Sequence, residues 1–317
     1  MQKLTDQLRY WLSRLNFHRR ISVLEQRESD RRCEGRDDIL DHLRMGEALC
    51  AGDDTKPRIH FIHVIGSPNP GDEFCGPELY FGEFFADHVQ YVHKFYGIRY
   101  DSILRDDVVV IGGGGLLEWC EGWQKTINRC VERCDNVVIW GAGDNTRRGN
   151  QPPKTAIRYE DMALVGCRDY NFRFDYVPCV SCMLPQLEKH YPITRRIGVV
   201  EHQQYPIRDF PQFEKISNRT RDVRTVLRFI GQSEIILTNT YHVWYWATLM
   251  GKKVILTEKI ASKFDHLRYS PTYYSGDLEA DIARCETHPD ALEEARRLNR
   301  DFAEKVLQLL RQPEAEP

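Results

Sequence analysis

The sequence predicts an α/β protein with two Rossmann-like domains that face a cleft. Two observations support this prediction. Short runs of β-branched and aliphatic residues recur along the chain, and most of them lead into loops of glycine and small polar residues followed by helical spacing. This order is typical of βα units in a parallel sheet, and it restarts near residue 190, which divides the chain into two series.

The first series contains several candidate strands, expected at residues 58–65, 108–111, 136–140, 163–167 and 176–177. The first strand leads into the polar loop 66–73, and the aromatic-rich stretch 74–89 is expected to be helical after Pro77. The second strand leads into four consecutive glycines, and a helical pattern starts at Leu116. Each strand is thus followed by a loop in which a ligand could bind.

In the second series, strands are expected at residues 196–200, 233–237 and 252–256. Helices are expected between them at 222–230 and 243–250, and Gly251 is suited to end the second helix. A last helix is expected at 290–310, where apolar residues recur on one face. We expect this helix to pack back on the first domain.

The expected parts of the chain are an N-terminal extension at 1–55, Rossmann-like domains at 56–190 and 191–290, and the terminal helix at 291–317. The extension is expected to be helical and partly mobile, with a charged stretch at 26–38 and a short helix at 39–49. Its first residues form a basic amphipathic pattern, which suits either peripheral contact with an anionic membrane or packing on the protein itself or a partner.

The composition excludes several classes of protein. A formal net charge of -3 gives no support for nucleic-acid binding, and no apolar run is long enough to span a bilayer. We also expect no secretory signal peptide. The cysteines include one CxxC pair, Cys179 and Cys182, and no histidines have metal-ligand spacing. We therefore expect free thiols in a reducing cytoplasm, no metal and no cofactor.

The glycine run at 112–115, which includes Gly113, Gly114 and Gly115, predicts an anion site. At a strand-to-helix turn these glycines would let the backbone approach a ligand, close to the positive end of a helix dipole. A tight turn without a ligand is the alternative. The run matches neither a Walker loop nor the dinucleotide-binding fingerprint.

Four further side chains follow predicted strands and could carry chemistry. Arg168 could hold a carboxylate or phosphate with its planar fork, or it could pair with Asp169 at the surface. His242 and His202 could act as acid or base, or they could be buried histidines held by backbone bonds. Asp72 could hold a substrate hydroxyl or act as a base, or it could cap a helix.

In order along residues 58–258, these motifs resemble the polysaccharide pyruvyl transferase family. The motifs are Asn69-Pro70-Gly71-Asp72-Glu73, the segment from Ile111 to Leu117, Gly141-Ala142-Gly143, Arg168-Asp169, and His242 with Ala247 and Gly251. The resemblance implies a fold like that of the GT-B glycosyltransferases. It also implies transfer of the enolpyruvyl unit of phosphoenolpyruvate onto two hydroxyls of one sugar, with formation of a cyclic pyruvate ketal and release of phosphate.

The resemblance implies roles for individual residues. Arg168 would bind the anionic groups of the donor, His242 would contact the donor as acid or base, and the glycine amides would help to shape the cleft. The chain departs from the family at Thr240, where members commonly carry an arginine two residues before the histidine. The set of cations that would bind the anionic donor then lacks one member, unless one of four other basic residues replaces it: Arg195, Arg196, Lys252 or Lys263.

The segment 239–246 is rich in hydroxyls and aromatic rings, which suits a carbohydrate ligand, although such rings could equally form a helix core. The predicted substrate contacts include Asn69, Asn239, Thr240 and Tyr241, with His242 and Asp72 as catalytic residues.

The predicted protein is a pyruvyl transferase of surface-polysaccharide assembly, cytoplasmic or peripheral on the inner membrane face. Its donor would be phosphoenolpyruvate and its acceptor a lipid-linked or nucleotide-linked sugar. The alternatives are a GT-B glycosyltransferase that uses a nucleotide sugar and a non-catalytic sugar-binding relative.

Overall fold

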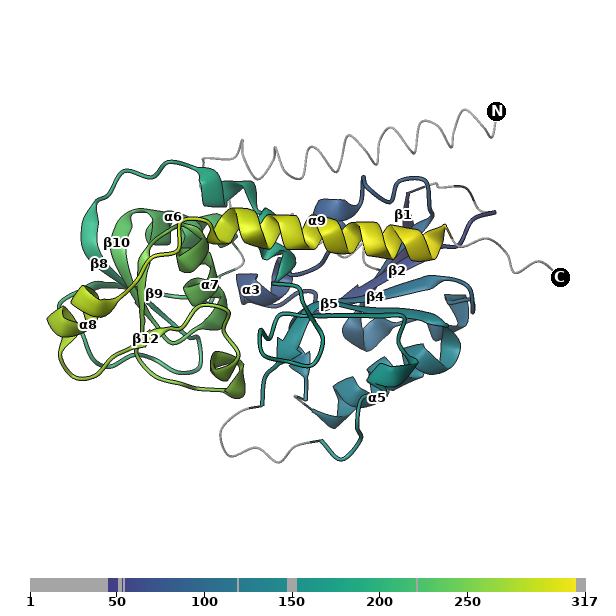
Figure 1. Cartoon of the computed structure of the whole chain (residues 1–317), viewed down its shortest axis with the longest axis horizontal. Coiled ribbons are helices and arrows are strands. Elements are labelled where there is room, and N and C mark those ends of the chain that lie inside the picture. Colours follow the sequence, from purple (N-terminus) through teal and green to yellow (C-terminus); the bar gives the residue numbers. More distant parts are fainter. Residues whose placement is uncertain are drawn as a thin grey trace.

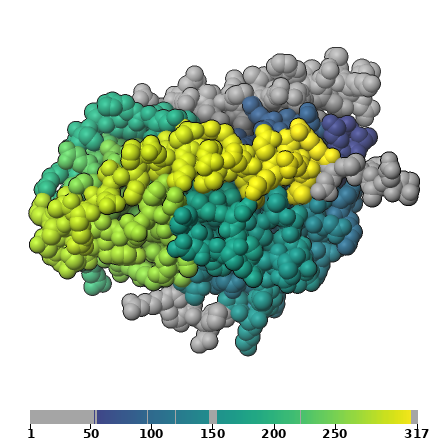
Figure 2. Space-filling view, viewed as in Figure 1, coloured from purple at the N-terminus to yellow at the C-terminus, as the bar shows by residue number. Residues whose placement is uncertain are grey.

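The structure is a computed structural model that describes residues 45–50, 53, 55–118, 120–146, 153–220 and 222–311. Two sheets lie side by side, and the long helix α9 (Ala291–Leu310) runs across both of them (Figure 1). Figure 2 shows the same helix lying across the outside of both halves. The predicted α/β class, with two Rossmann-like units built on parallel sheets, is confirmed. The amphipathic and charged patterns at 1–38 lie outside the described residues.

The first sheet has seven strands in the order β1-β3-β2-β4-β5-β6-β7. They are β1 (Met45–Cys50), β2 (Ile59–His63), β3 (Gln90–Lys94), β4 (Val108–Leu117), β5 (Asn136–Asp144), β6 (Leu164–Cys167) and β7 (Asp175–Tyr176). Neighbouring strands are parallel except for β1, which pairs with β3 in the antiparallel direction. The helices that accompany this sheet are α3 (Pro70–Glu73), α4 (Glu78–Phe81) and α5 (Glu121–Arg133).

The second sheet has five parallel strands in the order β12-β11-β10-β8-β9. They are β8 (Arg195–Glu201), β9 (Glu214–Ser217), β10 (Ser233–Thr238), β11 (Lys253–Leu256) and β12 (Thr272–Tyr273). The helices α6 (Val223–Gly231), α7 (Tyr241–Leu249) and α8 (Leu278–Arg284) accompany it. Helix α7 is buried along its whole length, because it packs between the second sheet and the first half of the chain.

Helix α9 ties the end of the chain to the first sheet. Phe302 lies in the same apolar cluster as residues of β2, β4 and β5, and its ring centre is 5.3 Å from that of Trp140. The Trp140 indole donates to Oδ1 of Asn299 at 2.8 Å, so the buried indole N–H is satisfied. The chain therefore returns from the second sheet to cover one face of the first.

Three elements differ from the sequence prediction. Residues 45–50 form the edge strand β1 rather than part of a helix, since pairing with β3 overrides local helix propensity. Strand β4 continues through the glycine run to Leu117, so the predicted strand-to-helix turn at 112–115 is wrong. Of the predicted helix after Pro77, only the single turn α4 is helical.

Candidate functional site

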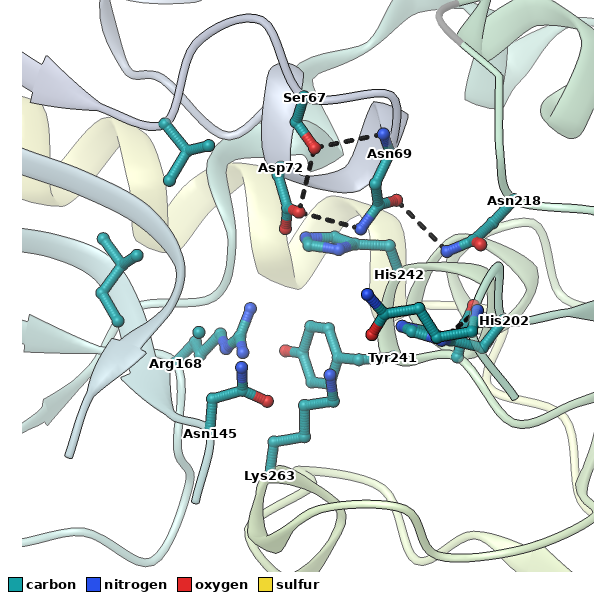
Figure 3. A pocket seen from close by; sticks show the side chains of 15 residues that line it. Ser67, Asn69, Asp72, Asn145, Arg168, His202, Asn218, Tyr241, His242 and Lys263 are labelled. Atoms are coloured by element: carbon teal, nitrogen blue, oxygen red, sulfur yellow. Dashed lines mark hydrogen bonds between the residues drawn. The ribbon is translucent and has the colours of Figure 1, made fainter. Parts of the chain in front are cut away.

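A pocket of about 300 Å³ opens where the carboxyl ends of strands from both sheets meet (Figure 3). The first half supplies Val64, Ser67, Asn69, Asp72, Gly115, Leu116, Asn145 and Arg168. The second half supplies His202, Gln204, Asn218, Thr240, Tyr241, His242 and Lys263. Parallel α/β sheets place their ligands at this edge, so the position favours a binding site.

Arg168 follows β6 directly and is buried, with 3% of its surface exposed. Its guanidinium carbon lies 4.0 Å from the ring centre of Tyr241, so a cation from the first half rests on an aromatic ring of the second. Nε and Nη1 of Arg168 have no hydrogen-bond partner in the part of the chain that the structure describes. Asp169, the partner expected for a surface ion pair, instead accepts a bond from the backbone N–H of Asp144.

A second cation, Lys263, lines the pocket. Figure 3 shows Arg168, Tyr241 and Lys263 on the same side of His242. The other three candidates for replacing the family arginine are engaged elsewhere. Arg195 pairs with Glu214, Arg196 pairs with Glu279, and Lys252 donates to the carbonyl of Gly231. Of these four basic residues, Lys263 is the one that belongs to the pocket lining, and its ammonium group also lies over the ring of Phe264.

Thr240 caps a helix in this structure. It is the N-cap of α7, and its hydroxyl accepts a bond from the N–H of Val243 at 3.3 Å. The following residues, Tyr241 and His242, occupy the first turn of the helix and both line the pocket. The cap thus fixes where the helix begins, and with it the position of both rings.

Asp72 and Asn69 form the opposite wall. Asn69 is the N-cap of α3 through its contact with the N–H of Gly71, so the predicted capping role belongs to Asn69 rather than to Asp72. The carboxylate of Asp72 accepts bonds from Nδ2 of Asn69 at 3.0 Å and from the hydroxyl of Ser67 at 3.3 Å. Burial raises the pKa of Asp72, while Lys263, the Asn69 bond and Arg168 act in the opposite direction. A carboxyl of this kind can exchange a proton nearer to neutral pH.

His242 is 7% exposed, and its Nε2 lies 3.5 Å from Sγ of Cys179. Burial lowers the pKa of His242 well below its usual value, and the positive charges of Arg168 and Lys263 lower it further. The imidazole is therefore neutral at physiological pH. A neutral imidazole can accept a proton, or it can donate a hydrogen bond without carrying charge.

The ring of His242 packs directly on Gly71 of α3. A Cβ built on Gly71 would lie 2.1 Å from Nδ1 of His242, which is far closer than any real contact. We expect Gly71→Ala to displace the imidazole and lower turnover by at least tenfold, a typical effect of misplacing a group that takes part in a reaction. The matched control is Gly122→Ala in α5, where a Cβ meets nothing within 4 Å.

This prediction is checked by thermal unfolding and turnover measurements of the two variants. Gly122→Ala should keep full turnover and gain up to about 0.5–1 kcal/mol of stability from its helical position. Full turnover by a well-folded Gly71→Ala protein would show that the position of His242 does not matter.

The last three glycines of the run lie within β4 and differ in their surroundings. A Cβ on Gly113 would meet the carbonyl oxygen of Cys75 at 2.1 Å, and Gly113 and Gly114 have positive φ of 48° and 85°. These two glycines let the α3 segment pack closely on β4. Gly115 lines the pocket, where a Cβ would collide with the side chain of Asn145. Helix α5 begins only at Glu121, so its N-terminus does not directly follow the glycine run.

A short loop after β8 forms the mouth on the side of the second half. Asn239, which the sequence predicts to bind substrate, is fully buried and holds this loop in place. Its Oδ1 accepts a bond from the N–H of His202, and its Nδ2 donates to the carbonyl of Tyr205, both at 2.8 Å. Asn218 accepts from the N–H of Gln203 at 2.7 Å. The loop is therefore fixed, and it places His202 and Gln204 in the pocket lining.

Comparisons with known proteins identify no family. No family model matches the sequence, and no curated protein matches it either. Among solved structures, the chain is similar to a functionally uncharacterized protein from Klebsiella pneumoniae subsp. pneumoniae NTUH-K2044. The two share 15% sequence identity with a TM-score of 0.46, over 76% of this chain and 98% of that chain.

The sequence predicts eight of the pocket residues as site residues and names Lys263 as a candidate cation, but it does not indicate the others. The missed polar ones are Ser67, Asn145, Gln204 and Asn218. Asn145 and Asn218 each come directly after a strand, so correct strand ends would have pointed to them. The described ranges contain no group of three or more His, Cys, Asp or Glu side chains that could hold a metal ion. Nor does any helix within them have the length and apolarity needed to cross a membrane.

Proposed function

We propose that this chain is a pyruvyl transferase, which moves the enolpyruvyl unit of phosphoenolpyruvate onto two hydroxyls of a sugar in a surface-polysaccharide precursor. The observation that carries the proposal is the buried guanidinium of Arg168, whose Nε and Nη1 find no hydrogen-bond partner among the described residues. Burying a cation with unused donors is costly, and a bound anion would satisfy them. Lys263 lines the same pocket and adds a second positive charge.

The size of the pocket favours a small donor. At about 300 Å³ it stands at the lower end of the range of roughly 300–1,000 Å³ usual for ligand pockets. Phosphoenolpyruvate is a compact trianion whose carboxylate and phosphate match a guanidinium and an ammonium group. A nucleotide sugar, the substrate of the alternative glycosyltransferase, is considerably larger.

The lining also contains the groups that the reaction needs. In the first step, one sugar hydroxyl adds to C2 of phosphoenolpyruvate, and the C3 methylene gains a proton to become a methyl group. In the second step, the other hydroxyl displaces phosphate from C2, which closes the ketal. Asp72 and His242 lie beside each other in the lining. Asp72 would move these protons with the assistance of His242, and Arg168 with Lys263 would stabilise the departing phosphate.

The fixed loop after β8 suits the acceptor sugar. The ring of Tyr205 is 37% exposed, and its centre lies 5.1 Å from that of the pocket residue His202. An exposed aromatic face beside polar side chains such as Gln204 offers a surface for one face of a sugar ring. The sugar would be part of a lipid-linked or nucleotide-linked precursor on the cytoplasmic side.

Tyr205→Ala should raise the KM for the acceptor about fivefold, as expected for the loss of roughly 1 kcal/mol of aromatic contact. The affinity for phosphoenolpyruvate should not change, since the donor binds at Arg168. Steady-state kinetics with each substrate varied in turn would measure the two effects. The matched control is Leu104→Ala. Leu104 is an exposed apolar residue just before β4, at the end of that strand away from the pocket. An unchanged acceptor KM would remove Tyr205 from the acceptor site.

The proposed function is tested by calorimetric titration of the purified protein with phosphoenolpyruvate, with uridine diphosphate in parallel. Binding of phosphoenolpyruvate, followed by phosphate release when a sugar acceptor is added, is the expected result. Binding of the nucleotide alone would overturn the proposal in favour of a nucleotide-sugar glycosyltransferase. Binding of an oligosaccharide without either donor would point to the non-catalytic sugar-binding alternative.

A further inference from the structure

The two ring nitrogens of His242 have different surroundings. Nε2 lies 3.5 Å from the thiol sulfur of Cys179, which is fully buried. Nδ1 is on the side of α3, where it packs against Gly71, the residue before Asp72. Figure 3 shows the ring beside the side chains of Asp72 and Asn69. Nε2 is therefore the nitrogen that contacts the thiol, and Nδ1 is the nitrogen on the side of α3 and Asp72.

The direction of the Cys179 contact follows from a chain of buried groups. The indole Nε1 of Trp246 lies 3.0 Å from the hydroxyl of Ser181, and an indole nitrogen can only donate. Ser181 thus accepts from Trp246, and its own proton is best satisfied by Sγ of Cys179 at 3.3 Å. With its sulfur already accepting, the thiol directs its own proton to Nε2 of His242.

The ionisation states agree with this direction. Burial raises the pKa of Cys179, so the thiol keeps its proton at neutral pH. Burial also lowers the pKa of His242, so the imidazole does not take that proton away. Both members of the pair are neutral, and the S–H group is the donor available to Nε2.

We propose that Cys179 is a positioning residue that holds His242 in the tautomer protonated at Nδ1. In this tautomer His242 presents an N–H donor toward the side of Asp72 and cannot take a proton there. In the proposed transferase, on which this consequence rests, His242 would donate a hydrogen bond to the donor substrate, and Asp72 would be the group that exchanges protons. Sequence reasoning had left the acid and base roles of His242 open.

The tautomer can be measured without any substrate. The full-length chain is labelled with ¹⁵N-histidine, and long-range ¹H–¹⁵N correlation spectra are recorded near neutral pH. The signals of His242 among the 11 histidines are assigned by their loss in His242→Asn. The expected pattern is a protonated Nδ1 and an unprotonated Nε2. A proton on Nε2 instead of Nδ1, or protons on both nitrogens, would overturn the proposal. The spectrum of the wild-type protein is sufficient for this test.

Two variants test the role of the thiol. Cys179→Ser keeps a donor and should keep the Nδ1–H pattern, whereas Cys179→Ala removes it and should give a mixture of tautomers. An unchanged pattern in Cys179→Ala would show that the thiol does not set the tautomer. If Cys179→Ala does not fold, Ser181→Ala can be used instead, because it removes the hydroxyl that donates to the sulfur of Cys179. A mixture of tautomers is again the expected result.

A kinetic readout separates this proposal from the proposed function. Cys179→Ala should lower kcat about tenfold with little change in the KM for phosphoenolpyruvate, and Cys179→Ser should restore most of the loss, as is usual for a group that orients a catalytic residue. If the chain has no pyruvyl transferase activity, the proposed function fails but the Nδ1–H pattern remains. If activity is present and the pattern is reversed, only the positioning role fails.

Discussion

Arg168→Met is expected to weaken phosphoenolpyruvate binding by about 2–4 kcal/mol, a loss of roughly thirtyfold to almost a thousandfold in Kd. Methionine fills much of the space of the arginine stem but removes the charge and all five donors. The large effect is expected because the guanidinium is 3% exposed, so its bonds to an anion are formed away from water. Calorimetric titration of wild type and variant measures the difference.

The same variant separates a binding role from a structural one. A structural buried arginine would have its donors satisfied, and its removal would be strongly destabilising. Nε and Nη1 of Arg168 have no hydrogen-bond partner within the described part of the chain, so we expect Arg168→Met to unfold at the same temperature as wild type or higher. The control is Arg196→Met, which removes an arginine with a 57% exposed side chain from its pair with Glu279 and should leave binding unchanged. A large fall in stability with no specific loss of binding would refute the anion-site assignment.

The regular part of the fold could be predicted because its strands are buried on both faces. Strands β4, β8 and β10 contain runs of β-branched and aliphatic residues, and such runs are distinctive in sequence. Strand β3 escaped prediction because its pattern is polar: His93 lies 2.9 Å from His60, which in turn contacts Asp107. A buried hydrogen-bonded network replaces apolar packing there, and no hydrophobic pattern reveals it. The edge strands β9 and β12 have only four and two residues.

The candidate site was predictable where its residues follow strands. Arg168 and His202 come immediately after β6 and β8, and parallel sheets bring such positions together. Lys263 was named only as one of four basic residues, since it lies in a single-turn helix well after β11 and no periodic signal marks it. The glycine run was misread because a strand was expected to stop at the first glycine. Gly113 continues β4 with a positive φ, which glycine adopts readily, and its missing Cβ leaves room for Cys75.

His242→Ala is expected to lower turnover by about a hundredfold or more, the usual scale for a group that assists proton transfer. The effect on phosphoenolpyruvate affinity should be much smaller than that of Arg168→Met, since the imidazole is neutral. The control is His190→Ala, which removes an exposed histidine outside the pocket lining. Single-turnover rates with saturating donor measure the chemical step directly. Equal turnover in folded wild-type and His242→Ala proteins would exclude a chemical role for this residue.

The Asn variant refines this prediction. The amide nitrogen of asparagine can stand near the position of Nδ1, so His242→Asn should retain more turnover than His242→Ala if the ring acts as a donor. If His242 must accept a proton, both variants should lose the same amount, because neither side chain is basic. The comparison therefore reports on the chemical role of the ring without relying on the spectroscopic measurement.

The low pKa of His242 also has a consequence for stability. The unfolded chain takes up a proton on this histidine near pH 6.5, whereas the folded protein does not. The unfolded state binds more protons in that range, so wild type should lose stability as the pH falls below about 6.5 toward the folded-state pKa. His242→Ala and His242→Asn lack this titration and should lose less. Urea unfolding at several pH values would measure the difference. Parallel pH dependence in all three proteins would mean that folding does not change the pKa of His242.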